Sequence, residues 1–359
     1  MPMRRKFAVN QKRRTQSDPA AAGPVFVVGM WRSGTSLLYA LLNQHPQIAL
    51  MYEGDLPLLW RLFRKGKAKR DWLQRWEFWN GALSRHGINT GTLPAEMTSL
   101  RAAMEAVYRQ HAGLAMWGCK SPNYFDCMVR LAEEFPEGRF IVIYRNPADI
   151  CRSVLRAGQK SRWFAKSGMS LRALLGYREM KQEASRLAAL GAHLYELQYE
   201  DMVRDPASVL TGISRFLNIP FDPRTVSLAG ADRSAIYDAD HHALVKGTQI
   251  VAGAQREEIL PAKLEKKIER YVHYWREEFG GRWPAYPSDD ADSGNRRRAG
   301  WMERTSDRLI YRSLRAFDRA VASFYCFAPL GILRFYRGLK RSRLDLPKPE
   351  KVLNSASAD

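Results

Sequence analysis

The stretch PVFVVGMWRSGTSLL, residues 24–38, joins a short apolar run to a glycine-containing turn and then to the start of a helical pattern. A continuous apolar run that ends in a turn is typical of a strand buried on both faces. A turn in this position points successive backbone N–H groups at a bound anion, helped by the positive end of the following helix. The stretch therefore predicts a strand, a phosphate-binding loop and a helix.

The loop at residues 29–36 has the length of a Walker A sequence, GxxxxGK[ST], but Thr35 stands in the position of the lysine. Nucleotide triphosphatases need that lysine for the β- and γ-phosphates. The presence of Thr35 in place of that lysine favours a loop that binds the phosphate of a different donor. Arg32 would then supply a cation from another position in the loop. The candidate donor-binding residues of the loop are Arg32, Ser33, Gly34, Thr35 and Ser36.

Similar apolar runs recur along the chain and alternate with helical patterns. Further strands are expected at residues 114–118, 140–144 and, more weakly, 193–199. Apolar periodicity predicts helices at residues 35–44, 124–135, 148–157, 170–190, 206–217 and 261–279. Strands that alternate with helices indicate a parallel sheet covered on both sides. The predicted fold class is α/β, a three-layer αβα architecture with a central, mostly parallel sheet, similar to that of P-loop nucleotide-binding proteins.

The sequence FIVIYRNPADICRS, residues 140–153, predicts a second anion site. Arg145 ends a predicted strand, at the edge where open α/β sheets bind ligands. Asn146 and Pro147 suit the N-cap and first position of the next helix, which puts Ser153 about two turns into it. A guanidinium and a hydroxyl suit a terminal phosphate. A single arginine in this position is more often part of a surface ion pair, but two phosphate sites in this order are a stronger indication.

With HP at residues 45–46, the loop closely resembles the 5′-phosphosulfate-binding loop of sulfotransferases that use 3′-phosphoadenosine-5′-phosphosulfate (PAPS). It looks most like the branch that includes tyrosylprotein and many bacterial sulfotransferases. The resemblance implies that Arg145 and Ser153 bind the 3′-phosphate of PAPS, and that 3′,5′-ADP is the product.

Further motifs extend the resemblance over roughly residues 24–280: KSP at 120–122, YEDMV at 199–203 and FLNIPF at 216–221. Tyr199 thereby joins the expected donor-binding residues. The segment VKGTQ at 245–249 stands where a donor-covering loop is expected, but it departs from the family pattern.

The resemblance also implies the catalytic residues. In sulfuryl transfer, as in phosphoryl transfer, the acceptor and the leaving phosphate lie in line, and charge builds on the leaving oxygen. Lys120 matches a family lysine near the bridging oxygen and is expected to stabilise that charge. Glu53 is the predicted base, because it follows residues 45–46 by the interval of the glutamate in the tyrosylprotein branch. Asp55 and His242 are the alternative bases. The reaction needs no metal.

Composition limits the partners and the compartment. The formal net charge is +20, and residues 296–343 alone carry 13 Lys and Arg against 3 Asp and Glu. Such a field favours a phosphorylated nucleotide, an anionic membrane or a nucleic acid, of which the last is the least favoured by the motifs. The four cysteines form no CxxC or Cys/His cluster, which favours a reducing cytoplasm over a disulfide framework or zinc site. We expect no secretory signal and no apolar stretch of the roughly 20 residues that span a bilayer.

The predicted organisation is a flexible basic arm (1–23), a sulfotransferase domain (24–285), a linker (286–295) and a basic helical extension with a tail (296–359). Within the domain, residues 54–110 are rich in Trp and Arg and are expected to form a helical lid over the acceptor pocket. Aromatic and cationic side chains together suit a lipid headgroup, a sugar or an anionic small molecule. The acceptor stays unidentified at this stage.

The C-terminal extension contains Ile310, Leu314, Phe317, Val321 and Phe324 at helical spacing, with arginines between them. This pattern predicts a basic amphipathic helix. Two roles remain open for it: it lies on an anionic membrane as a peripheral anchor, or its apolar face docks on the core.

Two other function classes are also open. A P-loop-like kinase would bind Mg-ATP, and a basic nucleic-acid-binding protein would bind DNA in a salt-dependent manner that is indifferent to the loop. A sulfotransferase would instead bind 3′,5′-ADP.

Overall fold

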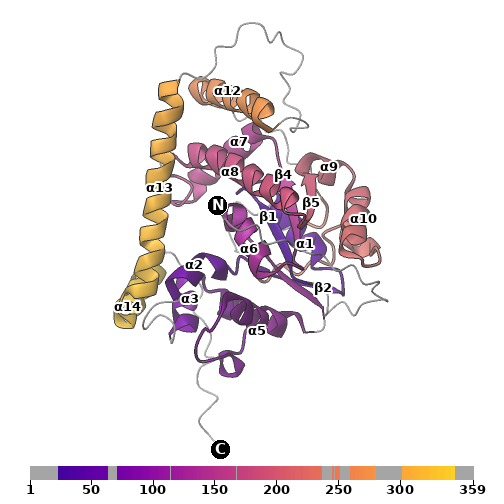
Figure 1. The fold of residues 1–359 in the computed structure, drawn as a ribbon, viewed down its shortest axis with the longest axis vertical. Coiled ribbons are helices and arrows are strands. Elements are labelled where there is room, and N and C mark those ends of the chain that lie inside the picture. The colour runs from indigo at the N-terminus through magenta and orange to yellow at the C-terminus, as the bar shows by residue number, and fades with distance from the viewer. Residues whose placement is uncertain are drawn as a thin grey trace, which may run out of the picture.

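The computed structural model describes residues 23–63, 71–113, 115–166, 168–236, 245, 247–250, 259–279 and 301–343. Its centre is a sheet of five parallel strands in the order β2-β3-β1-β4-β5. The strands are β1 (Val25–Gly29), β2 (Ile48–Tyr52), β3 (Met116–Lys120), β4 (Arg139–Tyr144) and β5 (His193–Gln198). Helices cover both faces of the sheet (Figure 1), which confirms the predicted three-layer α/β fold class.

The central strand β1 is apolar on both sides. Val25 and Val27 pack against one layer of helices, whereas Phe26 and Val28 pack against the other. All four side chains are completely buried. A strand with no solvent-facing side needs no polar alternation, and this is why a continuous apolar run predicted it correctly.

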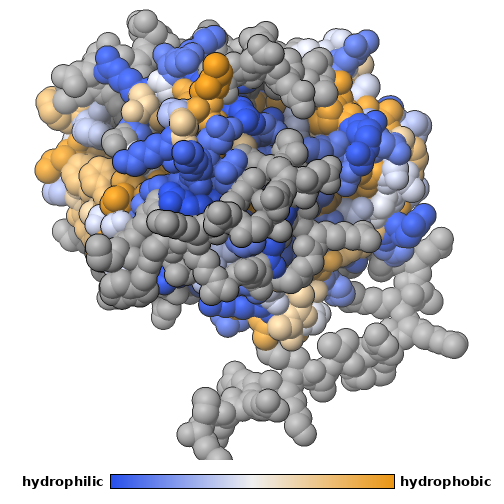
Figure 2. All heavy atoms as spheres, turned by 90° about the horizontal axis from the view of Figure 1, so that it is seen from above, coloured by the Kyte–Doolittle hydropathy of each residue, from blue (hydrophilic) through white to orange (hydrophobic). Residues whose placement is uncertain are grey.

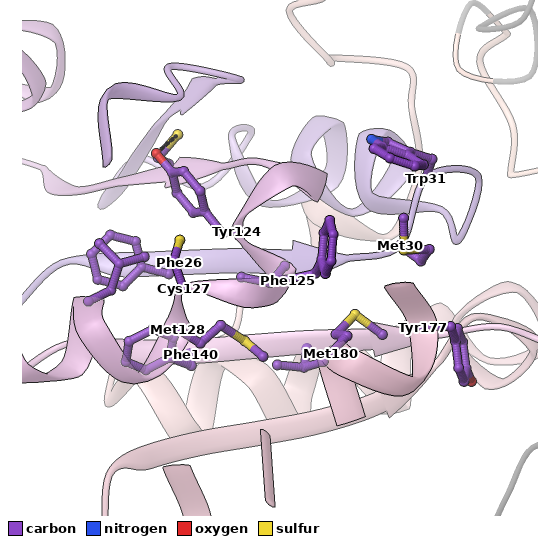
Figure 3. Close-up of a cluster of buried hydrophobic side chains, with 14 of the residues drawn as sticks. Phe26, Met30, Trp31, Tyr124, Phe125, Cys127, Met128, Phe140, Tyr177 and Met180 are labelled. Carbon is purple, nitrogen blue, oxygen red and sulfur yellow. Dashed lines mark hydrogen bonds between the residues drawn. The ribbon is translucent and has the colours of Figure 1, made fainter. Parts of the chain in front are cut away.

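Each face of the sheet carries its own layer. The layer on the Val25 side consists of α1 (Thr35–Leu42), α9 (Tyr199–Arg204) and α10 (Pro206–Leu217). The opposite layer consists of α5 (Leu100–Ala112), α6 (Met128–Glu134), α7 (Pro147–Lys160), α8 (Met169–Ala189) and α12 (Ala262–Phe279). Figure 3 shows the second layer's core, where Phe26 and Phe140 lie 5.1 Å apart between ring centroids, near Met128.

Two strands differ from the sequence prediction. The strand expected at residues 114–118 is β3, which continues to Lys120 because Gly118 does not end it. A Cβ on Gly118 would lie 2.0 Å from the Val25 carbonyl oxygen, so this glycine permits close approach to β1. Strand β2 was not predicted, because its apolar run Ile48–Tyr52 passes directly into Glu53-Gly54-Asp55, residues that are typical of a turn.

Two helical boundaries also differ. The helix expected at residues 124–135 is divided into the 3₁₀ helix Pro122–Asp126 and α6. The weak strand expected at residues 193–199 ends at Gln198, and Tyr199 begins α9.

The region expected to form a lid contains α2 (Leu56–Phe63), α3 (Trp72–Asn80), α4 (Ala82–Arg85) and the 3₁₀ helix Thr90–Thr92 before α5. Helix α5 contacts β2 and β3 and is part of the covering layer. Trp72 and Trp76 of α3 are completely buried, with ring centroids 6.1 Å apart, so they belong to the core. The cationic segment at residues 64–70 lies outside the described residues. A lid role for the remainder stays a prediction.

The predicted C-terminal helix is α13 (Trp301–Phe327), and it is followed by α14 (Leu330–Arg343). Figure 1 shows α13 along one side of the molecule, from α12 at one end to α2 and α3 at the other. Among the described residues, no single helix has the length and apolar character to cross a bilayer. Residues 305–327 and 330–336 together would qualify by length and composition as a pair that is bent by 119°. The predicted arm (except residue 23), linker and tail beyond residue 343 lie outside the described residues.

Candidate active site

The predicted phosphate-binding loop, residues 29–36, connects β1 to α1. Gly34 precedes the helix with φ 98°, and Arg32 has φ 70°. The loop is closed by a hydrogen bond from Ser33 N to Met30 O at 3.0 Å. A Cβ on Gly34 would lie 2.4 Å from Cδ2 of Tyr199, so both the backbone conformation and the packing require glycine. The loop thus presents backbone N–H groups at the start of a helix, where anions bind.

The second predicted anion site lies directly beside this loop. Arg145, which follows β4, donates from Nη1 to the Arg32 carbonyl oxygen at 3.0 Å. Arg32 in turn donates from Nε to Ser153 Oγ on α7 at 2.9 Å. Asn146 caps α7 by accepting from Ala148 N at 2.9 Å, as its sequence position predicted. Two sites that are far apart in sequence therefore form one cluster at the carboxyl edge of the sheet.

This cluster brings the guanidinium groups of Arg32 and Arg145 close together in a largely buried environment. Burial, together with the nearby charge of Arg145, lowers the pKa of Arg32 to about 10. The Arg145 guanidinium lies 4.3 Å from the centroid of the Tyr199 ring. Among the described residues, Arg145 Nε and Ser33 Oγ are buried and have no hydrogen-bond partner. Buried polar atoms normally have partners, so these residues fit a phosphorylated nucleotide.

A second cation comes from the adjacent strand. Lys120, at the end of β3, has a side chain that is only 1% exposed. Its Nζ donates to Glu53 Oε1 at 2.7 Å and to Ser36 Oγ at 3.2 Å. Burial lowers the pKa of Lys120, and the carboxylate of Glu53 opposes that shift. The chain therefore brings an ammonium group to the start of α1 although Thr35 has replaced the loop lysine.

Tyr52, which the sequence analysis did not single out, completes this group. Its ring centroid lies 3.8 Å from Lys120 Nζ, and its hydroxyl lies 2.7 Å from Ser36 Oγ. Burial, followed by the charge of Glu53, raises the pKa of Tyr52 well above its usual value. Tyr52 directly precedes Glu53, so a correct prediction of β2 would have pointed to it.

Glu53 is fixed by its backbone. It has φ 50°, and its N–H donates to the Lys120 carbonyl oxygen at 2.7 Å. Asn80 donates from Nδ2 to the Glu53 carbonyl oxygen at 2.8 Å, and Arg85 donates from Nη2 to the Tyr52 carbonyl oxygen at 3.0 Å. The Glu53 side chain is 18% exposed, so an acceptor could approach it. Asn80 and Arg85 carry no sequence motif, and nothing in the local pattern pointed to them.

Asp55, the alternative base, is held by two hydrogen bonds. Its Oδ1 accepts from Ser121 Oγ at 2.5 Å, and its Oδ2 accepts from Asn123 Nδ2 at 3.1 Å. Asn123 also accepts from Trp31 Nε1 at 3.2 Å, so the carboxylate connects the turn after β3 to the phosphate-binding loop. Burial, followed by the charge of Glu53, raises the pKa of Asp55 to about 6. Since Asp55 is 4% exposed and both of its oxygens are engaged, its geometry indicates a positioning role.

Backbone strain is concentrated at this site. Among the described residues, the non-glycine residues with positive φ are Arg32, Glu53, Asp55 and Asn218. The first three lie in the candidate active site, and Asn218 caps the end of α10. Such conformations are sparsely populated and tend to occur at functional sites.

The remaining predicted residues are two histidines and the expected donor-covering segment. His45, in the HP motif, is buried and lies 2.9 Å through Nε2 from the Pro220 carbonyl oxygen, which indicates a structural role. His242 lies outside the described residues, as does Lys246 in the expected donor-covering segment. In the part of the chain that the structure describes, no group of three His, Cys, Asp or Glu side chains could hold a metal ion.

Comparison with known proteins relates the chain to one family. A family model described as "Sulfotransferase family" matches residues 24–223. None of the curated proteins compared with the sequence matches it.

Several solved structures are similar. The sulfotransferase domain of the Synechococcus PCC 7002 olefin synthase is 20% identical, with a TM-score of 0.49 over 76% of this chain and 100% of that domain. A sulfotransferase from Alicyclobacillus acidocaldarius is 18% identical, with a TM-score of 0.39 over 73% of this chain and 98% of that one. A mouse sulfotransferase in complex with PAP is 14% identical, with a TM-score of 0.41 over 72% of this chain and 85% of that one.

Proposed function

Because the chain belongs to the sulfotransferase family, we propose that it transfers a sulfuryl group from PAPS to a hydroxyl or amine group of an acceptor and releases 3′,5′-ADP. One observation carries this proposal: Arg32 joins the phosphate-binding loop to Arg145 and Ser153 through hydrogen bonds of 3.0 and 2.9 Å. Two adjacent anion sites suit a nucleotide that carries charged groups on both its 3′ and 5′ oxygens. ATP carries phosphates at one end only.

The two sites would divide the donor between them. The N–H groups of residues 34–36 and the unpartnered Ser33 hydroxyl would bind the 5′-phosphosulfate at the start of α1. Arg145 and Ser153 would bind the 3′-phosphate, and the ring of Tyr199 would support the Arg145 guanidinium. The strained Arg32 would then lie between the two anionic groups.

Glu53 and Lys120 would carry out the transfer. The Glu53 carboxylate would accept the proton of the acceptor hydroxyl, whose oxygen then forms the new bond to sulfur. As the bond between sulfur and the bridging phosphate oxygen breaks, Lys120 and the loop N–H groups would stabilise the charge on that oxygen. The distance of 2.7 Å between the carboxylate and the ammonium supports their acting on one reacting group.

Aromatic side chains beside the loop support a lipid- or sugar-type acceptor. The rings of Trp31 and Trp163 have centroids 5.1 Å apart, and the Arg172 guanidinium lies 4.6 Å from the Trp31 centroid. Trp163 is 38% exposed, so part of its ring is available for contact. Ring faces and a cation together bind sugar rings and amphiphilic molecules well.

Calorimetric titration with 3′,5′-ADP, 5′-AMP, Mg-ATP and duplex DNA tests this function. We expect 3′,5′-ADP to bind most tightly, and Arg145→Ala to weaken it by about tenfold to a hundredfold, as expected for loss of a charged hydrogen bond. The weaker binding of 5′-AMP should be unaffected by Arg145→Ala, since it lacks the 3′-phosphate. Arg204→Ala, at an arginine whose side chain is 75% exposed outside the site, is the matched control.

Two results would contradict the proposal. Binding of Mg-ATP that equals or exceeds that of 3′,5′-ADP would favour a kinase. Salt-dependent DNA binding that Arg145→Ala leaves unchanged, without binding of 3′,5′-ADP, would favour a nucleic-acid-binding protein.

A further inference from the structure

Helix α13 contacts the body of the protein through polar side chains. The pairs along its length are Arg172 with Asp318, Arg315 with Asp126, Lys267 with Asp307, and Tyr311 with Glu179. Near the C-terminal end, Arg75 donates from Nη1 to the Ala328 carbonyl oxygen at 2.9 Å. An amphipathic helix usually buries its apolar stripe against the core. Here ion pairs and hydrogen bonds hold much of the inner face, and Tyr311, Ala322 and Cys326 pack against the core beside them.

The opposite face is apolar and exposed. Eight of the twelve exposed large apolar side chains in the described part of the chain lie on α13 and α14: Leu309, Ile310, Phe317, Phe324, Phe327, Ile332, Phe335 and Tyr336. Residues 310, 317 and 324 recur every seven positions, so they form one stripe along α13. Phe317 is 59% exposed and Phe335 is 69% exposed. We call these eight residues the outer stripe.

The charges around the outer stripe have one sign. Residues 305–336 contain only two acidic residues, Asp307 and Asp318, and both are engaged in the ion pairs of the inner face. Arg308, Arg312 and Arg319 are exposed and project from one side of α13, because their spacing brings them within a narrow arc of the helix. The outward surface is therefore apolar and cationic, and its described residues include no exposed acid.

We propose that the outer stripe docks on an anionic membrane surface, with α13 and α14 lying in the plane of the interface. Apolar side chains of such helices enter the boundary between headgroups and acyl chains, while flanking arginines contact anionic headgroups. The inner-face ion pairs hold α13 along the protein, so the helix lies on the membrane and does not cross it. The 119° bend between the helices is compatible with this arrangement.

Charge complementarity favours a membrane over a second copy of the chain. Two copies docked through this segment would bring together two stretches, residues 296–343, that each carry 13 Lys and Arg against 3 Asp and Glu. Like charges in contact are destabilising, whereas anionic lipid headgroups would neutralise them.

The docking surface lies close to the candidate active site. Arg172 pairs with Asp318 of α13 and also lies over the ring of Trp31 in the phosphate-binding loop. Lys166 Nζ lies 5.7 Å from the ring centroid of Phe317 in the outer stripe. In the end-on view of Figure 2, apolar atoms lie at the margin where α13 stands in Figure 1, and other apolar atoms lie on the opposite side. A docked membrane would thus bring amphiphilic molecules near the site, although docking itself does not depend on the proposed donor.

Flotation of the full chain with vesicles tests the proposal. The vesicles contain phosphatidylcholine alone or phosphatidylcholine with phosphatidylglycerol. We expect recovery with the anionic vesicles only, and a loss of about tenfold or more when Arg308, Arg312 and Arg319 are all changed to Glu. Changing Phe317 and Phe335 to Ser should reduce recovery similarly. The matched control changes the exposed Arg215, Lys263 and Lys266 to Glu, which alters net charge by the same amount, and it should float like the unmodified chain.

Each other result overturns the proposal. Failure of the full chain to float, equal recovery with both vesicle types, or equal loss in the control set would exclude specific docking by this face. If sedimentation instead shows a dimer that the Phe317 and Phe335 changes dissociate, without vesicle binding, the outer stripe is covered by a second copy. Melting curves verify that each variant is folded. If the phenylalanine changes unfold the chain, flotation of the variant with the three arginine changes tests the proposal on its own.

Discussion

The ammonium of Lys120 lies 2.7 Å from the carboxylate of Glu53, and the backbone N–H of Glu53 donates to the carbonyl oxygen of Lys120. The two residues are therefore linked twice, through their side chains and through the pairing that continues from β2 and β3. The proposed base and the proposed cation for the leaving oxygen are placed by the same two strand ends. Their relative position is a property of the sheet and not of a mobile loop.

Glu53→Gln should lower turnover by about 10²- to 10⁴-fold, since a positioned base contributes that much to proton transfer. Affinity for 3′,5′-ADP should change by less than about threefold, because Glu53 lies outside the nucleotide cluster. Transfer of labelled sulfate from PAPS to lipid and glycan extracts measures the first quantity, and calorimetry measures the second. Glu96→Gln, at an exposed position, is the control. Retention of more than about a tenth of the activity would exclude Glu53 as the base.

Gly34→Ala should destabilise the protein by about 1–3 kcal/mol and weaken 3′,5′-ADP binding at least about tenfold. The added Cβ meets both a backbone φ of 98° and the ring of Tyr199 at 2.4 Å. Gly191→Ala separates these causes, because Gly191 has φ 71° but nothing within 4 Å of a Cβ. It should cost about 1 kcal/mol in urea unfolding without changing nucleotide binding. Equal losses of binding in both variants would show that Tyr199 does not restrict the loop.

Acid should destabilise the folded protein through His86. Its Nε2 accepts from Tyr52 N at 3.0 Å, and burial, followed by the charges of His111 and Arg85, lowers its pKa to about 3 from 6.5. Between these values the unfolded chain binds a proton that the folded protein does not, so stability falls as pH drops below about 6.5.

His86→Gln keeps an acceptor for Tyr52 and removes this titration. The melting temperature of His86→Gln should therefore fall less than that of the unmodified chain between about pH 7 and pH 4. His193→Gln, at an exposed position in β5, should leave the unmodified pH profile unchanged. A profile for His86→Gln that is parallel to the unmodified one would contradict the assignment.

Asp318→Asn should lower the free energy of unfolding by about 1–3 kcal/mol, because it leaves the largely buried Arg172 without its carboxylate. Asp201→Asn breaks an exposed pair with Arg204 and should change the same quantity by less than about 0.5 kcal/mol. Urea unfolding measures both. Equal effects would mean that the inner-face pairs of α13 contribute no more than ordinary surface ion pairs.

The sequence predicted those parts of the fold that depend on local chemistry. The apolar run of β1 and the cap of α7 by Asn146 can each be recognised from a few neighbouring residues. Strand β2 was not recognised, because the residues that directly follow it, Glu53-Gly54-Asp55, have the composition of a turn. The hydrogen bond between Arg32 and Ser153 joins residues 121 positions apart, and no local pattern specifies it. The Walker A comparison pointed to Arg32 and the family resemblance to Ser153, but only the folded chain brings the two residues together.

Periodicity had a similar limit in α13. The spacing of Ile310, Phe317 and Phe324 predicts one apolar stripe, but it does not specify which face meets the protein. That choice is made by the partners of Asp307 and Asp318 on α12 and α8, which lie far away in sequence. The sequence analysis therefore had to leave both roles of the helix open.

The register of β1 and β3 places Val27 beside Lys120, and this alignment has a chemical consequence. Side chains alternate across a sheet, so a slip of one residue between the two strands would turn Lys120 toward the opposite layer. The candidate active site can thus lose the ammonium group that β3 supplies without any substitution in the loop or at Lys120 itself. In this chain, mutations that shift strand pairing would abolish the proposed sulfuryl transfer while every proposed catalytic side chain is still present.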